Sequence, residues 1–153
     1  MYKLLMVIGL LTFSISSFSQ KVKIKDEIAT VDGTPTLKVV TASAFDNTIT
    51  ISGLNSTQDE IFATYLDYED PNKVSASNPE GKVRWIELNF LTIGVKCEIS
   101  SQGKKGLVKF IVNNKLYVDG VLNEENVNVV VQKYGMRFSE NRPNAGVTVI
   151  INN

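Results

Sequence analysis

The chain has 153 residues, with 16 basic and 16 acidic side chains and no histidine. A neutral balance without a basic block argues against nucleic acid as the main partner and against electrostatic docking on an anionic membrane. The lack of histidine excludes Ser-His and Cys-His nucleophile pairs, histidine-ligated zinc and the commonest general base.

The first 19 residues are typical of an export signal. Lys3 supplies a positive start, Leu4 to Phe13 form an apolar run, and the serines of "SFSQ" are the small residues that a signal peptidase requires. The run is shorter than the roughly 20 residues that cross a membrane, and no later stretch is long and apolar enough to do so. We therefore expect cleavage before Gln20 and a single exported domain over residues 20–153. Its expected location is the periplasm, the outer membrane surface or the outside of the cell.

Alternation of apolar and polar residues predicts four strands in the first half of the exported domain. In "KVKIKDE", Val22 and Ile24 share one face and lysines occupy the other. The dipeptide Asp32-Gly33 predicts a hairpin turn before "TLKVV". It also ends a pattern, Asp-x-Asp-Gly-Thr, used for phosphoryl transfer, but the nucleophile position is Thr30. The third and fourth predicted strands are "NTITISGL" and "EIFATYLDYED", residues 47–54 and 60–70.

The stretch "VRWIELNFLTIGVKCEIS", residues 83–100, changes its phase part-way. Apolar residues occupy alternate positions up to Phe90, and from Leu91 they occupy the other set. Because a strand has a side-chain period of two, we interpret the stretch as a long bent strand that carries a β-bulge near these two residues or bends between two packing surfaces. Gly94 would ease the bend. Cys97, the only cysteine, falls in the second apolar set and is expected to be buried and unreactive.

The last third of the chain is less regular. Leu107, Phe110 and Ile111 have helical spacing, but the β-branched content of residues 107–118 also allows a hairpin. The next segment predicts a helix: Asn123 can cap it, acidic residues follow, a valine stripe leads to Tyr134, and Gly135 ends it. We expect residues 137–146 to form a loop and "VTVIINN", residues 147–153, a terminal strand.

Three segments resemble small, uncharacterised exported proteins of Bacteroidota. They are the signal ending in "FSQ", the "VDGTPTLKV" hairpin and "KLYVDGVLNEENVNVVVQKYGMRFS". The resemblance implies a helix, a short Asp-Gly connector and a second helix closed by Tyr-Gly, and it favours helix over residues 107–113. It implies an exported location only and gives no activity to transfer to this chain.

We therefore predict an α+β fold. A curved antiparallel β-sheet comes first, a late helical pair packs on it, and the terminal strand returns to the sheet. The alternative is an all-β barrel or sandwich, which applies if residues 107–118 form a hairpin.

The segment "YLDYED" is the densest cluster of polar and aromatic residues. Its carboxylates have the oxygen ligands that calcium prefers, but the Asp-x-Asp-x-Asp-Gly spacing is missing. Its tyrosines, with Trp85, would stack on sugar rings if they shared an exposed face. The candidate binding residues are Tyr65, Asp67, Tyr68, Glu69, Asp70 and Trp85. We assign no catalytic residue, metal ligand or cofactor.

These patterns favour a non-enzymatic binding module of the envelope or the secreted fraction, whose partner is an unknown envelope protein or a glycan. One alternative is a hydrolase or lyase that uses paired carboxylates on a glycan. The other is a carrier of a small apolar ligand held in a cavity inside the sheet.

Overall fold

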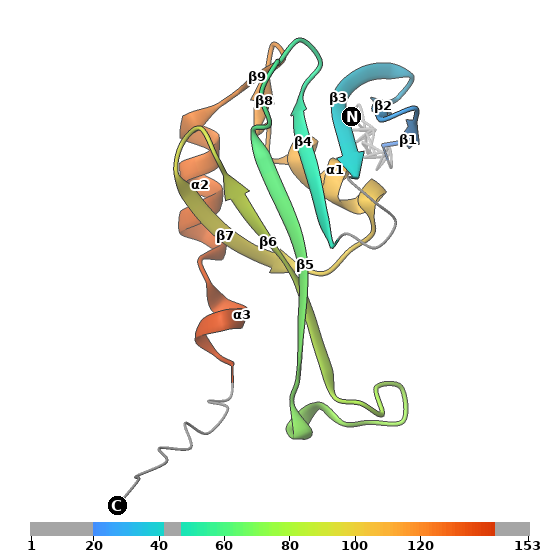
Figure 1. Cartoon of the computed structure of the whole chain (residues 1–153), viewed down its shortest axis with the longest axis vertical. Helices are drawn as coiled ribbons and strands as arrows, with labels where there is room; N and C mark the ends of the chain where they lie inside the picture. The colour runs from blue at the N-terminus through green and yellow to red at the C-terminus, as the bar shows by residue number, and fades with distance from the viewer. Residues whose placement is uncertain (1–19, 42–46, 143–153) are drawn as a thin grey trace, which may run out of the picture.

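The computed structural model of the chain describes residues 20–41 and 47–142. The predicted signal and the predicted terminal strand lie outside the described residues. Seven antiparallel strands form one sheet in chain order, and the helices follow them (Figure 1). The strands are β1 (Val22–Lys25), β2 (Ile28–Val31), β3 (Thr34–Thr41), β4 (Thr48–Gly53), β5 (Ile61–Glu69), β6 (Lys82–Phe90) and β7 (Val95–Ser100).

The later elements are helices joined by a small hairpin. A 3₁₀ turn, η1 (Pro71–Lys73), lies between β5 and β6. After the sheet come α1 (Lys104–Asn113), β8 (Tyr117–Val118), β9 (Val121–Leu122), α2 (Glu124–Tyr134) and α3 (Arg137–Glu140). The predicted α+β class is confirmed, since helices pack on an antiparallel sheet. Within the described residues, β1 and β7 do not pair, so the sheet is not closed into a barrel.

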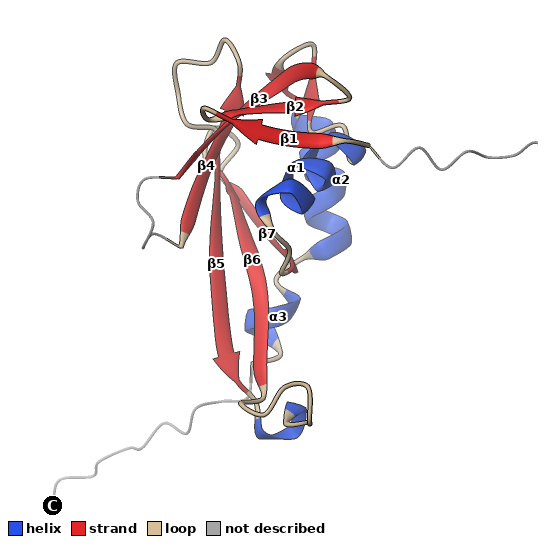
Figure 2. Ribbon diagram, turned by 90° about the vertical axis from the view of Figure 1, so that its right-hand side faces the viewer, coloured by secondary structure: helices blue, strands red, loops and turns tan. Residues whose placement is uncertain are grey.

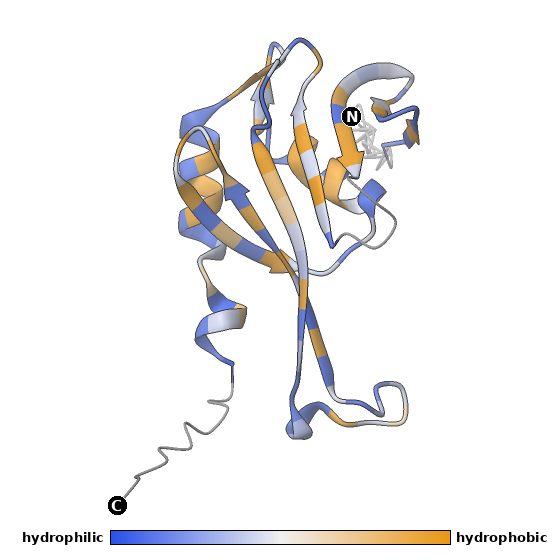
Figure 3. Cartoon of the chain, in the orientation of Figure 1, coloured by the Kyte–Doolittle hydropathy of each residue, from blue (hydrophilic) through white to orange (hydrophobic). Residues whose placement is uncertain are grey.

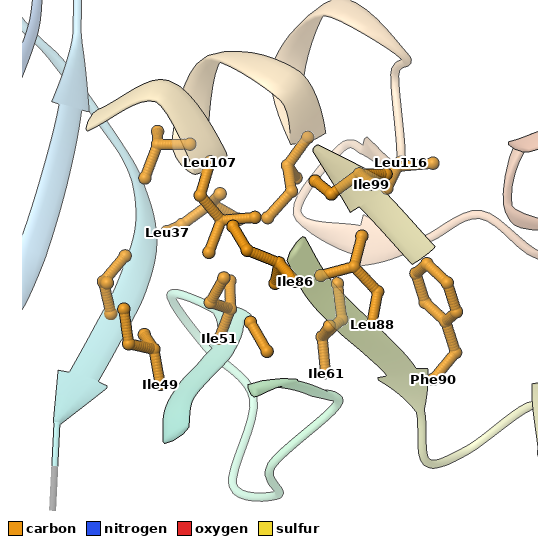
Figure 4. Close-up of a cluster of buried hydrophobic side chains, with 14 of the residues drawn as sticks. Leu37, Ile49, Ile51, Ile61, Ile86, Leu88, Phe90, Ile99, Leu107 and Leu116 are labelled. Atoms are coloured by element: carbon orange, nitrogen blue, oxygen red, sulfur yellow. The ribbon is translucent and has the colours of Figure 1, made fainter. Parts of the chain in front are cut away.

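The main core lies between one face of the sheet and the helices α1 and α2 (Figures 2 and 4). We call this the core face; the opposite side of the sheet is the outer face. α1 contacts β1 and α2 contacts β7, so the sheet curves around both helices. Figure 3 shows apolar and polar residues alternating along the strands, as a sheet with one covered face requires. The buried helical residues are Leu107, Val108 and Ile111 of α1 and Val127 and Val130 of α2.

Local signals in the sequence account for several boundaries. Asp32 and Gly33 have φ angles of 52° and 87°, as a two-residue hairpin turn requires. The Asn123 side chain accepts a hydrogen bond from the Asn126 N–H at the start of α2. Gly135 ends α2 with a φ of 55°, a conformation that favours glycine. The expected hairpin turn and the limits of the second helix are therefore confirmed, and residues 104–113 are helix.

The predicted single strand over residues 83–100 is wrong. The stretch is a hairpin: β6 ends at Phe90, a four-residue turn covers residues 91–94, and β7 begins at Val95. The Phe90 carbonyl accepts hydrogen bonds from the N–H groups of Ile93 (3.2 Å) and Gly94 (2.7 Å), which close the turn. The change of phase therefore comes from a reversal of the chain, not from a bulge. The predicted loop from residue 137 also begins with one helical turn, α3.

The β8–β9 hairpin is held against the sheet by Glu60. One carboxylate oxygen of Glu60 accepts hydrogen bonds from the Gly53 N–H (2.8 Å) and from the Tyr117 hydroxyl (2.9 Å). Burial, and then the charge of Glu60, raise the pKa of Tyr117. A Cβ at Gly53 would run into the Gly120 carbonyl, so the close approach of the hairpin requires glycine here. This contact fixes the β8–β9 end of the molecule.

Candidate functional site

Strands β5 and β6 extend beyond their neighbours and form a projecting arm. The two strands pair along nine residues each. β4 pairs only with residues 61–64 of β5, and β7 only with residues 85–90 of β6. We call residues 66–84, which include η1 and the connecting loop, the arm. Figures 1 and 2 show it projecting beyond the other strands of the sheet, and Figure 1 places it at the opposite end of the molecule from β8 and β9.

The three candidate aromatic residues are not on one face. Tyr65 lies on the core face, packs against the core, and has a pKa raised by burial. Tyr68 and Trp85 lie on the outer face, where their rings meet edge to face with centroids 5.5 Å apart. A sugar platform made of all three residues is therefore not present. Two of them form a cluster at the base of the arm.

Trp85 is covered by α3 and is only 5% exposed. The Phe138 ring stacks on the indole with an interplanar angle of 7° and centroids 6.0 Å apart. Arg142 lies over the Tyr68 ring at 5.8 Å, and Arg137 over Phe138 at 5.1 Å. The aromatic cluster is thus an outer layer of packing beneath α3, and its indole is not a free stacking surface.

Glu98 fastens α3 to the outer face. Its side chain is buried, with 1% exposure, and one carboxylate oxygen accepts hydrogen bonds from the backbone N–H groups of Phe138 (2.7 Å) and Ser139 (3.0 Å). Its own backbone N–H donates to the Gly135 carbonyl at 2.8 Å. The other carboxylate oxygen and the Trp85 indole N–H are buried without a partner among the described residues. Glu98 was not among the predicted site residues, because its position in β7 is typical of a solvent-facing residue.

The three candidate carboxylates do not converge. Asp67 and Glu69 are exposed on the arm, directly opposite Arg84 and Lys82 of β6. Asp70 is buried and caps η1 by accepting hydrogen bonds from the backbone and side-chain N–H groups of Asn72. Within the described ranges, no group of three or more cysteine, aspartate or glutamate side chains is arranged to hold a metal ion. Asp70 therefore has a structural contact that accounts for it, and Asp67 and Glu69 remain available at the surface.

Cys97 is buried on the core face of β7. Burial, and then the charge of Glu98, raise the pKa of its thiol to about 12. The thiolate, which is the nucleophilic form, is therefore disfavoured at neutral pH. Cys97 packs in the hydrophobic core, and its thiol is not accessible to a ligand.

A shallow hollow lies on the outer side of α2. Its lining residues are Glu124, Glu125, Asn128, Val129 and Gln132. All belong to one helix, and the two carboxylates lie side by side in its first turn. Without side chains from a second element, the hollow does not bring acid and base groups together across a cleft.

The chain matches no protein-family model, and comparison with curated proteins and with solved structures gives no significant match. Over the part of the chain that the structure describes, no helix has the length and apolar character needed to cross a membrane. The candidate site therefore rests on the geometry of the arm.

Proposed function

We propose that the chain is an exported, non-enzymatic binding module and that the arm contacts its partner. The projection of the arm carries this proposal. A two-stranded element that extends past the rest of the sheet adds little to the core, and its apolar side chains Leu66 and Val74 are exposed. Because the arm projects, these two side chains are accessible to another protein.

The geometry gives less support to the two alternatives. A glycan hydrolase needs two carboxyl groups that face each other across the substrate. Asp67 and Glu69 instead follow one another along an exposed strand, and Asp70 caps η1. A carrier would need space inside the curved sheet, and side chains of α1 and α2 such as Leu107, Ile111 and Val127 occupy the core face.

Export rests on the sequence of the first 19 residues and is tested separately. We expect the chain recovered from the periplasm or the medium of its host to begin at Gln20, as measured by intact mass. A chain recovered with Met1 still attached, or found only in the cytoplasm, would contradict the exported location.

The binding role of the arm is tested by site-specific photo-crosslinking. Val74 at the end of the arm and Val121 on β9 are both exposed valines, 57% and 67%, at opposite ends of the molecule. We would place a photo-crosslinking amino acid at each position in turn and irradiate the purified chain with an envelope extract of its host. We expect a discrete cross-linked protein from position 74, removed by excess unlabelled chain, and none from position 121. Equal products from both positions, or a product from position 121 alone, would contradict the proposal.

A further inference from the structure

Along the arm, the outer edge of β5 carries backbone hydrogen-bonding groups that pair with no strand among residues 20–41 and 47–142. Backbone groups alternate between the two sides of a strand. The Tyr65 N–H donates to the Asn47 carbonyl at 2.8 Å on the β4 side, and the Asp70 N–H donates to the Gly81 carbonyl at 2.9 Å on the β6 side. The N–H and C=O groups of Asp67 and Glu69 therefore point to the β4 side, where no described strand pairs with them.

The outer edge of β6 is closed at the same level. Both backbone groups of Lys82 bond to the side-chain amide of Asn78: its N–H donates at 3.0 Å and its C=O accepts at 3.2 Å. The Arg84 carbonyl accepts from the Ser101 N–H at 3.4 Å. The contrast between the two edges shows that the arm offers one side for pairing.

The side chains along the open edge alternate in character. Leu66 and Tyr68 lie on the outer face, and Asp67 and Glu69 lie on the other face of the arm. The cations opposite these carboxylates are Arg84 and Lys82, and Lys82 forms an ion pair with Glu80 at 2.6 Å. A strand added at the open edge of β5 would lie beside Asp67 and Glu69, and one strand further from Arg84 and Lys82. An added strand would thus meet Leu66 and the Tyr68 ring, with Arg142 over that ring, on one face and two carboxylates on the other.

We propose that the open edge of β5 binds its partner by strand addition, and that the partner supplies an extended segment in which apolar and basic residues alternate. The segment would lie about 4.8 Å from β5 and bond to the backbone of Asp67 and Glu69. Its apolar side chains would pair with Leu66 and Tyr68, and its basic side chains with the two carboxylates. Carboxylates at the edge also discourage pairing with neutral or acidic strands, which makes the edge selective. This inference rests on the proposed binding role of the arm.

Synthetic peptides test the partner chemistry. The probe is a labelled, end-capped peptide Lys-Val-Lys-Ile-Lys-Val-Lys, whose binding to residues 20–153 is followed by fluorescence polarisation. One control peptide has glutamate in place of each lysine. In a second control peptide, every other backbone nitrogen is N-methylated, so that one edge of the extended peptide cannot donate hydrogen bonds. We expect the N-methylated peptide to bind at least about tenfold more weakly, the change that loss of one or two net hydrogen bonds produces. We expect no binding of the glutamate peptide. Equal binding of the parent and N-methylated peptides would overturn strand addition, as would no binding of the parent peptide.

Variants of the chain separate charge from backbone pairing. Asp67→Asn removes the charge and keeps the outward N–H, whereas Asp67→Pro removes both without breaking a bond to β6. We expect the proline variant to bind the probe several-fold more weakly than the asparagine variant. Asp59→Asn, an exposed change outside the arm, should bind as the unaltered chain does. Far-UV circular dichroism checks that each variant is folded.

Two outcomes distinguish the inference from the binding role on which it rests. If residue 74 cross-links a partner but the proline and asparagine variants bind the probe equally, the arm is a binding element and strand addition is wrong. If probe binding falls as the chain self-associates at high concentration, a second copy occupies the edge, and the inference of a foreign partner is overturned.

Discussion

Replacing Leu88 by alanine is expected to lower the free energy of unfolding by about 2–5 kcal/mol, the usual cost of truncating a large buried side chain. Replacing Leu91 by alanine, three residues later, should lower it by less than about 1 kcal/mol. Leu88 is fully buried on the core face of β6, whereas Leu91 lies in the turn after it and is 38% exposed. Urea unfolding followed by circular dichroism measures both changes.

This pair of variants also distinguishes the hairpin from one bent strand. In a strand with a bulge near residue 90, Leu91 would begin a second buried set, and its loss would cost as much as that of Leu88. Similar losses of stability for both variants would therefore contradict the turn at residues 91–94. An unchanged dependence of the unfolding free energy on urea concentration would show that each variant still unfolds from the same compact state.

The second large effect is expected at Glu98. Alanine there removes the acceptor of two backbone hydrogen bonds from α3, and bonds to a charged group contribute about 1.5–3 kcal/mol each. We expect α3 to detach and the Phe138 ring to leave the indole of Trp85. Trp85 is the only tryptophan in the chain, so its fluorescence emission should shift to longer wavelength as water reaches the ring.

Two further variants serve as references for Glu98→Ala. Glu98→Gln keeps one acceptor oxygen and should retain most of the blue-shifted emission. Glu140→Ala removes an exposed carboxylate from the same short helix and should leave the emission unchanged. If Glu98→Ala destabilised the chain without changing the Trp85 emission, the hydrogen bonds from α3 to Glu98 would not be what holds α3 over Trp85.

The parts of the fold that were predicted from the sequence are those with a local cause. A two-residue turn needs positive φ angles, which Asp32 and Gly33 tolerate, and a helix start needs a side-chain acceptor such as that of Asn123. The turn between β1 and β2 shows the limit of such signals. Asp26 and Glu27 also have positive φ angles, 48° and 63°, although neither is glycine. The pairing of β1 with β2 across this tight turn requires that conformation, which the residue types alone do not predict.

The parts that were not predicted depend on neighbours far away in the sequence. Leu91 and Ile93 are apolar residues in a turn, so the hydrophobic pattern continues through a reversal of the chain. Glu98 is buried because α3 covers the outer face of the sheet there, and an alternating pattern marks only which residues share a face. α3 itself is a single turn, too short to show a helical period.

The candidate site was predicted in its residues but not in its arrangement. The charged and aromatic character of residues 65–70 is visible in the sequence, yet Tyr65 faces the core and Asp70 caps η1. The open edge of β5 exists because β4 stops pairing at Thr64. Only the relative lengths of neighbouring strands reveal it, and alternation along a single strand carries no information about those lengths.

The order of the elements along the chain has a consequence for synthesis. Each strand of the seven-stranded sheet pairs with the strand just before it, so the sheet can grow as the polypeptide emerges with its N-terminus first. The helices that cover the core face are made last, from residue 104 onward. Until they emerge, Leu37, Ile51, Ile61 and Leu88 have no cover, and a nascent chain that stalls before α1 presents an adhesive apolar surface. The core face of the sheet is therefore protected from aggregation only after α1 and α2 have been synthesised and have packed on it.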